Sequence, residues 1–316
     1  MENFIFSVSV VLPLFLLIAL GYFLRRIEVF TADYVAMTSK ACFRVFMPVM
    51  LFVSIVSRRD EIRGELITVQ FVAIASIVLI VLFMIVVPIL EKDNFKRGAI
   101  VQALYRSNTI LFGVPLVTNI YGTAGLAPMA VVIATVVPLY NTAAVLIFAF
   151  FGNLDKNFIE MLKKIAKDLA TNPLIISSVL AIMLIVFNIR LPLVMERTLD
   201  SLAVIAPALA LLALGGGFKI KKAFGNMKYI IPITIQKMLI NPIAVVVIAV
   251  ALGFEGPRLA AVMVLFSAPV AVSSQVFAQE MGSDGELTGQ VTVVTSMVSC
   301  LTIFGFIYVL NMLNLL

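Results

Sequence analysis

The 316-residue sequence contains no histidine and only two cysteines, and charged residues make up 13% of it. Without histidine, the usual imidazole proton relay and imidazole metal ligand are absent, so we expect no cofactor and no metal site. Cys42 and Cys300 both lie within apolar runs, which gives no reason to expect a disulfide framework. The scarcity of charge leaves 62% hydrophobic residues, a proportion typical of a polytopic membrane protein.

Ten apolar runs are long enough to cross a bilayer as helices of about 20 residues. They cover residues 4–24, 35–57, 66–90, 98–121, 126–152, 173–189, 198–217, 229–252, 258–281 and 288–312. The sixth run is short enough to be a kinked or partial crossing. No basic segment or cleavage site accompanies the first run, so a removable signal peptide is not expected. We therefore predict an all-α polytopic membrane protein with ten transmembrane helices.

The net charge of +6 does not indicate a nucleic-acid partner, because in a membrane protein the positions of lysine and arginine matter more than their sum. Loops that follow odd-numbered helices hold most of the basic loop residues. This bias predicts both termini outside the cell and the segment 153–172 in the cytosol. That segment has the pattern of an amphipathic helix lying on the membrane surface, and it divides the chain into two halves.

The run at 98–121 is interrupted by polar residues and by Pro115. Proline has no N–H, and its ring collides with the carbonyl four residues back, so we expect the helix to open near Leu111. Hydrocarbon tolerates neither a free cation nor a broken hydrogen-bond ladder unless protein or a watery cavity receives it. We therefore expect a cavity at this break. Its residues include Arg106, Asn108 and Gly113.

A related break lies in the second half, where the sequence Leu-Phe-Ser-Ala-Pro ends at Pro269. It resembles Leu-Phe-Gly-Val-Pro ending at Pro115, and prolines recur at a spacing of about 155–160 residues. Matched prolines alone could be a coincidence, but the shared flanking residues argue against it. Because each copy would hold five helices, we predict a 5+5 inverted repeat, residues 1–152 and 173–316, with the proline-broken fourth and ninth helices crossed near the midplane.

Beyond each break a new half-helix begins, and its first N–H groups lack intrahelical acceptors. Two such ends facing each other make a partially positive spot that suits a small organic anion. Asn108 adds amide donors there, and Arg106 could add a full charge. Further polar residues that could belong to this site are Thr135, Tyr140, Asn141, Ser273 and Gln275.

Each of these residues also has a structural interpretation. Arg106 could pair with a carbonyl freed at the break or snorkel, Asn108 could bond another helix, and the serines could bond back to their own backbone. Lys237, in the eighth helix, is expected to support the crossing point or neutralise freed carbonyls. Glycines 215–217 are expected to permit close helix packing. No Asp or Glu lies near the midplane, which disfavours a carboxylate-based Na⁺ or H⁺ site but leaves coupling to either ion open.

The stretch from Asn108 to Pro115, together with Pro269 and the later Val-Phe-Ala-Gln-Glu ending at Glu280, resembles motifs of the auxin efflux carrier family. That family includes plant PIN auxin carriers and bacterial malate or malonate permeases. The resemblance implies that Asn108 contacts a substrate carboxylate and that Thr135 and Tyr140 lie near the pocket. Two departures from the plant pattern, Ser274 in place of a second proline and Arg106, leave the substrate and any coupling ion open.

The same resemblance implies a scaffold made of the first, second, sixth and seventh helices, which dimerises. The third to fifth and eighth to tenth helices would form a transport domain that moves in an elevator-like cycle. We therefore predict a homodimeric permease of small carboxylates in the bilayer of a bacterial cytoplasmic membrane. The alternative is a membrane sensor or lipid-binding module that uses this fold without transport. A channel fits less well, and an enzyme least, because no nucleophile-and-base pair lies in the membrane.

Overall fold

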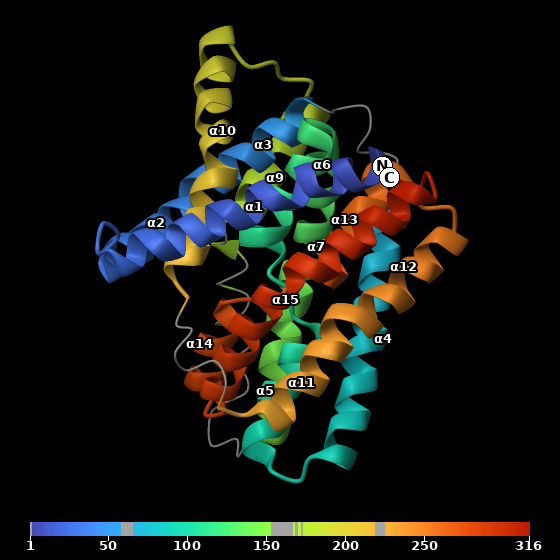
Figure 1. Ribbon diagram of the computed structural model, residues 1–316. Helices are drawn as coiled ribbons and strands as arrows, with labels where there is room; N and C mark the ends of the chain where they lie inside the picture. Colours follow the sequence, from blue (N-terminus) through green and yellow to red (C-terminus); the bar gives the residue numbers. More distant parts are fainter. Residues whose placement is uncertain (1, 58–65, 153–166, 168–169, 172, 219–224) are drawn as a thin grey trace.

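In the computed structural model the described residues are 2–57, 66–152, 167, 170–171, 173–218 and 225–316, and their regular structure is helical (Figure 1). The helices are α1 (Glu2–Arg26), α2 (Ala32–Ala41), α3 (Met47–Ser57), α4 (Leu66–Leu90), α5 (Asn94–Tyr105), α6 (Val114–Tyr121), α7 (Leu126–Phe151), α9 (Pro173–Val186), α10 (Leu193–Gly216), α11 (Met227–Ile235), α12 (Asn241–Ala251), α13 (Gly256–Ser267), α14 (Ser273–Glu280) and α15 (Gly285–Met312). Most of the predicted surface helix at 153–172 lies outside the described residues.

Seven helical stretches among the described residues are long and apolar enough to cross a membrane. They correspond to seven of the ten predicted runs. The other three runs, the fourth, sixth and ninth, contain shorter apolar helices, Thr109–Tyr121, Ile175–Val186 and Gly256–Ser267. The prediction of an all-helical membrane-spanning chain is thus confirmed at the level of seven candidate spans.

Short π-helical segments precede three of the prolines. They are η1 (Cys42–Phe46), η3 (Thr109–Gly113) and η6 (Gln236–Ile240), which end two residues before Pro48, Pro115 and Pro242. In each case the residue before the proline donates its N–H to the carbonyl five residues back, as Val114 does to Thr109. The wider turn accommodates a residue that has no N–H and a bulky ring, so the helix continues past the proline.

The helices α1 and α10 pack closely, and α10 also packs on α3, which in turn packs on α9. Glycines permit the α1–α10 contact. A Cβ atom at Gly21 would collide with the carbonyl oxygen of Leu212, and one at Gly215 would collide with that of Ile18. At Gly216 it would press on Val35 of α2. The expectation of close helix packing is confirmed for these two glycines of α10.

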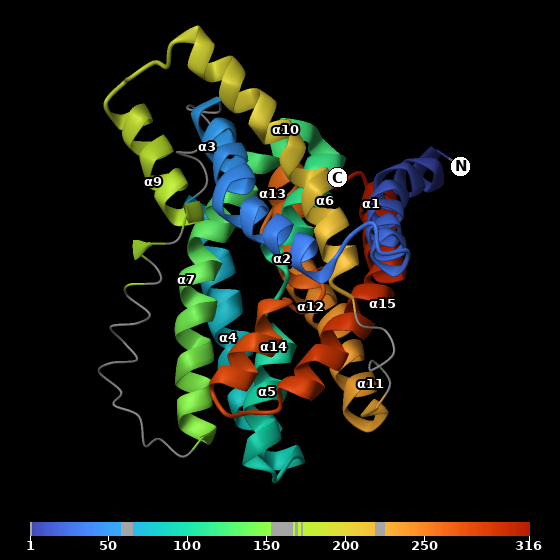
Figure 2. The ribbon, with the colours of Figure 1, turned by 90° about the vertical axis from the view of Figure 1, so that its left-hand side faces the viewer.

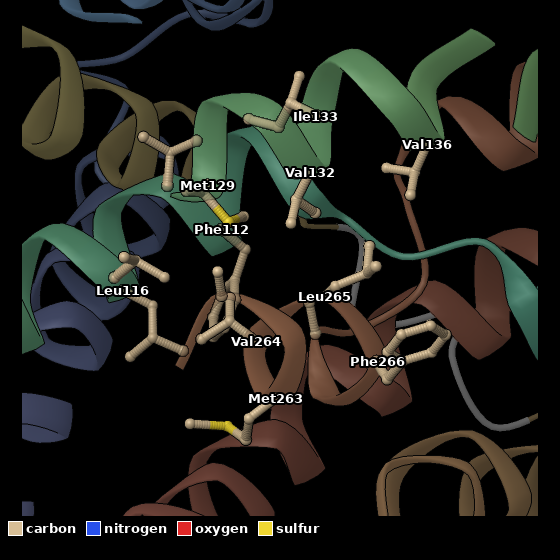
Figure 3. Close-up of a cluster of buried hydrophobic side chains, with 14 of the residues drawn as sticks. Phe112, Leu116, Met129, Val132, Ile133, Val136, Met263, Val264, Leu265 and Phe266 are labelled. Atoms are coloured by element: carbon tan, nitrogen blue, oxygen red, sulfur yellow. The ribbon is translucent and has the colours of Figure 1, made fainter. Parts of the chain in front are cut away.

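A second group of helices consists of α4, α5 and α7 on one side and α11 to α15 on the other. Its centre is an apolar cluster in which side chains of η3 and α6, α7 and α13 meet, with Phe112, Met129, Val132, Val264 and Leu265 among its members (Figure 3). Gly113 lies in this cluster, since a Cβ atom there would press on Met129 and Val264. The cluster packs the two interrupted runs against each other.

The two ends of the chain lie toward one end of the molecule, and the turn between α4 and α5 lies at the other (Figures 1 and 2). At that opposite end, the start of α5 is tied to the turn that joins α14 and α15. The Ser283 hydroxyl and the Asp284 N–H both donate to the carbonyl of Phe95, at 2.6 and 3.0 Å. The helices that carry the two breaks are therefore fastened together at a second point.

Candidate binding site at the two helix breaks

The two interrupted runs meet at their breaks. After α5 ends at Tyr105, residues 106–108 are not helical, and the π-helical turn η3 begins at Thr109. After α13 ends at Ser267, Ala268 is extended, and α14 begins at Ser273. The two short segments pair in antiparallel fashion at Ser107 and Val270. Each break thereby satisfies part of the backbone that it frees from helical bonding.

One hydrogen bond joins the two segments, and a second anchors the later segment to α15. The N–H of Asn108 donates to the carbonyl of Pro269 at 2.7 Å, and the N–H of Val270 donates to the Thr295 hydroxyl of α15 at 3.2 Å. The carbonyl of Asn108 in turn accepts from the N–H groups of Phe112 and Gly113, which start the new helical stretch. The Asn108 carbonyl therefore anchors the start of the helical stretch that follows the first break.

The position of the first break corrects the prediction of an opening near Leu111. The chain leaves the helix at Arg106, several residues earlier, and Leu111 lies within the turn η3. Pro115 lies at the start of α6 and is accommodated by that wider turn. The break is where the chain pairs with the second broken segment, a contact that a rule about proline and its own helix does not include.

Side chains of the extended segment alternate in direction, so Arg106 and Asn108 are expected on one side and Ser107 on the other. The contacts agree with this alternation. The Ser107 hydroxyl accepts a hydrogen bond from the ammonium of Lys237 at 2.5 Å, whereas Arg106 reaches α7 and α14. The segment thus has one face toward η6 and another toward the α14 side.

Lys237 and Asn241 satisfy the carbonyls at the end of α5. The ammonium of Lys237, 1% exposed, lies 3.3 Å from the carbonyl oxygen of Tyr105, and the Asn241 amide donates to the carbonyl of Leu104 at 2.9 Å. The carbonyl of Gln102 accepts from the N–H of Arg106. These carbonyls form the negative end of the α5 dipole, so a buried cation beside them is electrostatically favourable.

Arg106 is 7% exposed and has polar but uncharged partners. One guanidinium nitrogen, Nη2, donates to the Asn141 amide oxygen at 2.8 Å and lies 3.4 Å from the Ser273 hydroxyl. The guanidinium also lies over the Phe277 ring, 4.5 Å from its centre. In the described part of the chain, no carboxylate forms an ion pair with Arg106 or with Lys237.

Several buried polar atoms around the break have no partner among the described residues. Two are donors, Nη1 of Arg106 and Nδ2 of Asn108, and the Ser274 hydroxyl is a third group. The amide of Gln102 has neither atom partnered although its side chain is fully buried. Sequence reasoning missed Gln102. An amide one helical turn before Arg106 within an apolar run was the available signal.

The remaining predicted site residues differ in which parts of the structure they contact. Tyr140 approaches α5, since its carbonyl accepts from the Tyr105 hydroxyl and the two rings lie 5.1 Å apart. The Thr135 hydroxyl instead donates to the carbonyl of Val131 in its own helix. Gln275 lies against Gly289 of α15.

A cavity of about 530 Å³ lies between α2 and α10 on one side and α14 and α15 on the other. Its wall touches the broken runs at Leu111 and Val272. Polar side chains that line it are Ser39, Gln275, Gln279, Glu286, Gln290 and Thr292. Of the predicted site residues, Gln275 lines this cavity, whereas Arg106 and Asn108 are buried and are not among its lining residues. The cavity can hold a small organic molecule next to the breaks.

A comparison with known protein families identifies the general functional class of this chain. A family described as "Membrane transport protein" matches residues 6–307. The chain belongs to this membrane transport protein family. The match covers nearly the whole chain and confirms the resemblance to the auxin efflux carrier family.

Among curated relatives, the chain is similar to the "Putative malonate transporter" of Rhizobium meliloti (strain 1021). The two are 24% identical over 312 residues, which cover 96% of this chain and 95% of the relative. Both findings indicate an integral membrane protein with a transport role rather than an enzyme. Within a membrane transport protein, buried donors that lack an acceptor among the described residues, at helix breaks that border a cavity, form a candidate substrate site.

Proposed function

We propose that this membrane transport protein is a secondary transporter that carries a small organic anion, a carboxylate, across the bilayer. Its substrate site lies at the crossing of the two broken runs, and it opens alternately to the two sides in an elevator-like cycle. The ten runs form two inverted five-helix repeats, and the protein works as a homodimer in a bacterial cytoplasmic membrane with both termini outside.

The observation that carries the proposal is the pair of unpartnered donors at the first break. Arg106 Nη1 and Asn108 Nδ2 are buried N–H groups with no acceptor among the described residues. A buried donor without an acceptor costs about 1–3 kcal/mol, and more when it is charged. A carboxylate supplies two oxygens with several acceptor positions, so its binding offsets that cost. The name of the malonate relative supports the same substrate class.

The helix ends at the site also favour an anion. The stretch that starts at Thr109 and the helix that starts at Ser273 direct their first N–H groups toward the breaks. The carbonyl end of α5, which would repel an anion, is covered by Lys237 and Asn241. The local field is therefore positive on the side where Arg106 and Asn108 lie.

The elevator-like cycle is supported by the grouping of the helices. The group α1, α2, α3, α9 and α10 supplies the scaffold, and the group α4, α5, α7 and α11 to α15 supplies the moving domain, together with α6, which packs on α7 and α13 and also touches α1 and α10. The cavity of about 530 Å³ lies between these groups. A cavity at such a boundary gives the substrate a route to the site when the moving domain shifts.

Uptake into proteoliposomes tests the proposal. We expect saturable uptake of radiolabelled malonate or of another mono- or dicarboxylate that competes with it. Asn108→Ala should reduce uptake at limiting substrate about tenfold or more, because a hydrogen bond to a charged group is lost. Asn311→Ala, in the last turn of α15, is the matched control and should transport like the wild type. Stabilisation by phospholipids or sterols with no carboxylate uptake would favour the sensor or lipid-binding alternative.

A further inference from the structure

The carbonyl end of α5 presents oxygen atoms of the kind that coordinate an alkali cation in transporters. The carbonyl oxygen of Tyr105 and the hydroxyl oxygen of Ser107 converge on one point. Both residues lie where the helix breaks. In transporters with broken helices, unwound carbonyls and half-helix C-termini are the groups that coordinate a coupling Na⁺. Here the point where they converge is taken by the ammonium of Lys237.

Lys237 is held there by its own element. It lies in the π-helical turn η6, and Asn241, four residues later, donates to the neighbouring carbonyl of Leu104. Gln236 donates to the Asn241 side-chain oxygen at 2.8 Å, which orients that amide. Lys237 is 1% exposed. Unlike a bound ion, this ammonium is covalently attached to the protein, so it stays beside these oxygens throughout a transport cycle.

We propose that Lys237 is a built-in replacement for a coupling cation, so that transport requires no alkali ion at the carbonyl end of the first break. The inference rests on the proposed carboxylate transport. It assigns to Lys237 the role of a positioning residue: its charge stabilises the oxygens of the break, and the break then presents Arg106 and Asn108 to the anion.

Thermal unfolding of the purified protein tests the assignment without any transport. The wild type should have the same unfolding midpoint in NaCl as in choline chloride of equal ionic strength. Lys237→Ala should unfold at a lower temperature, and Na⁺ or n-propylammonium should restore part of the difference, because each returns a small cation to the oxygens. Tetramethylammonium, which presents no N–H and is too large, should not.

Two further variants separate charge from packing. Lys237→Met fills the same volume without a charge, so we expect a lowered midpoint that neither Na⁺ nor propylammonium corrects. Lys237→Arg keeps a charge and should retain more stability than Lys237→Met. If Lys237→Ala does not fold, this comparison decides the question alone. Equal midpoints for Lys237→Met and the wild type would overturn the assignment, as would a Na⁺-dependent midpoint in the wild type.

Uptake in proteoliposomes provides the functional comparison. Wild-type carboxylate uptake should be unchanged when Na⁺ is replaced by choline, and Lys237→Ala should show about tenfold lower uptake that rises again with Na⁺ or propylammonium. Uptake in the wild type that stops without alkali cations would contradict the inference. If the wild type transports no carboxylate at all, the proposed function fails, while the unfolding comparison still decides the role of Lys237.

Discussion

The extended backbone at the first break directs the side chains of Arg106, Ser107 and Asn108 to two opposite faces. Side chains of alternate residues leave opposite faces, so the serine meets Lys237, while the arginine and the asparagine each keep an N–H group that has no acceptor in the described part of the chain. The sequence alone singles out Arg106 and Asn108, because a cation and an amide within an apolar run are costly unless they have a functional role. The sequence does not predict that the three side chains point to two different faces, because this depends on the break beginning at Arg106.

Gln102 provides a prediction at this scale. Neither polar atom of its buried amide has a partner among the residues that the structure describes, so in the absence of ligand each unsatisfied group costs about 1–3 kcal/mol of stability. Gln102→Leu should therefore raise the unfolding temperature of the ligand-free protein while it lowers carboxylate uptake. Gln290→Leu is the control, because Gln290 accepts from Asn226 and its loss should lower stability. A Gln102→Leu protein that is both stabilised and fully active would remove Gln102 from the site.

Among the elements, the broken runs show how far local rules reach. The sequence predicts two interruptions and places the second one correctly at Pro269, which lies in the segment between α13 and α14. It places the first too late, because the rule for proline puts the opening near Leu111, whereas the helix ends at Tyr105. The turn η3 absorbs that proline, and pairing between Ser107 and Val270 sets the break instead. Such pairing joins residues far apart in the chain, so no window of sequence contains it.

The contact between α1 and α10 gives a prediction at the scale of elements. Gly215→Val should destabilise the protein by about 1–3 kcal/mol, because the added atoms collide with backbone rather than with a movable side chain. Gly305→Ala is the matched control. It lies within a helix with open space around it, so alanine should be neutral or stabilising by about 0.5–1 kcal/mol. Unfolding temperature in detergent measures both, and equal effects would argue against backbone contact at Gly215.

Across the whole molecule, the composition and the spacing of apolar runs are enough to predict an all-helical membrane protein, since bilayer thickness fixes the length of a span. The cavity beside the breaks was predicted only in outline. Its lining includes Gln290, which the sequence did not single out, and Gln279, which the sequence offered only as part of the motif that ends at Glu280. These residues line the cavity because α14 packs on α15, while residues of α2 and α10 form the facing wall, an arrangement that joins elements distant in the chain.

Movement between the two helix groups leads to a prediction for the whole molecule. Phe4 of α1 and Phe304 of α15 have ring centres 5.6 Å apart and belong to different groups. In a Cys42→Ala/Cys300→Ala background, a short bifunctional thiol reagent that joins Phe4→Cys to Phe304→Cys should stop uptake. The same reagent should leave uptake intact when it joins Phe95→Cys to Ser283→Cys, whose native residues are hydrogen-bonded within the moving group. Full uptake in both linked proteins would exclude an elevator-like motion.

The central claim is that an organic anion binds at the unpartnered donors of the first break. The most direct measurement is the shift in unfolding temperature that a panel of mono- and dicarboxylates produces in the purified protein, repeated with Asn108→Ala and Arg106→Gln. We predict that at least one carboxylate stabilises the wild type and that both substitutions remove most of the shift. Stabilisation that survives both substitutions, or no stabilisation by any carboxylate, would contradict the claim.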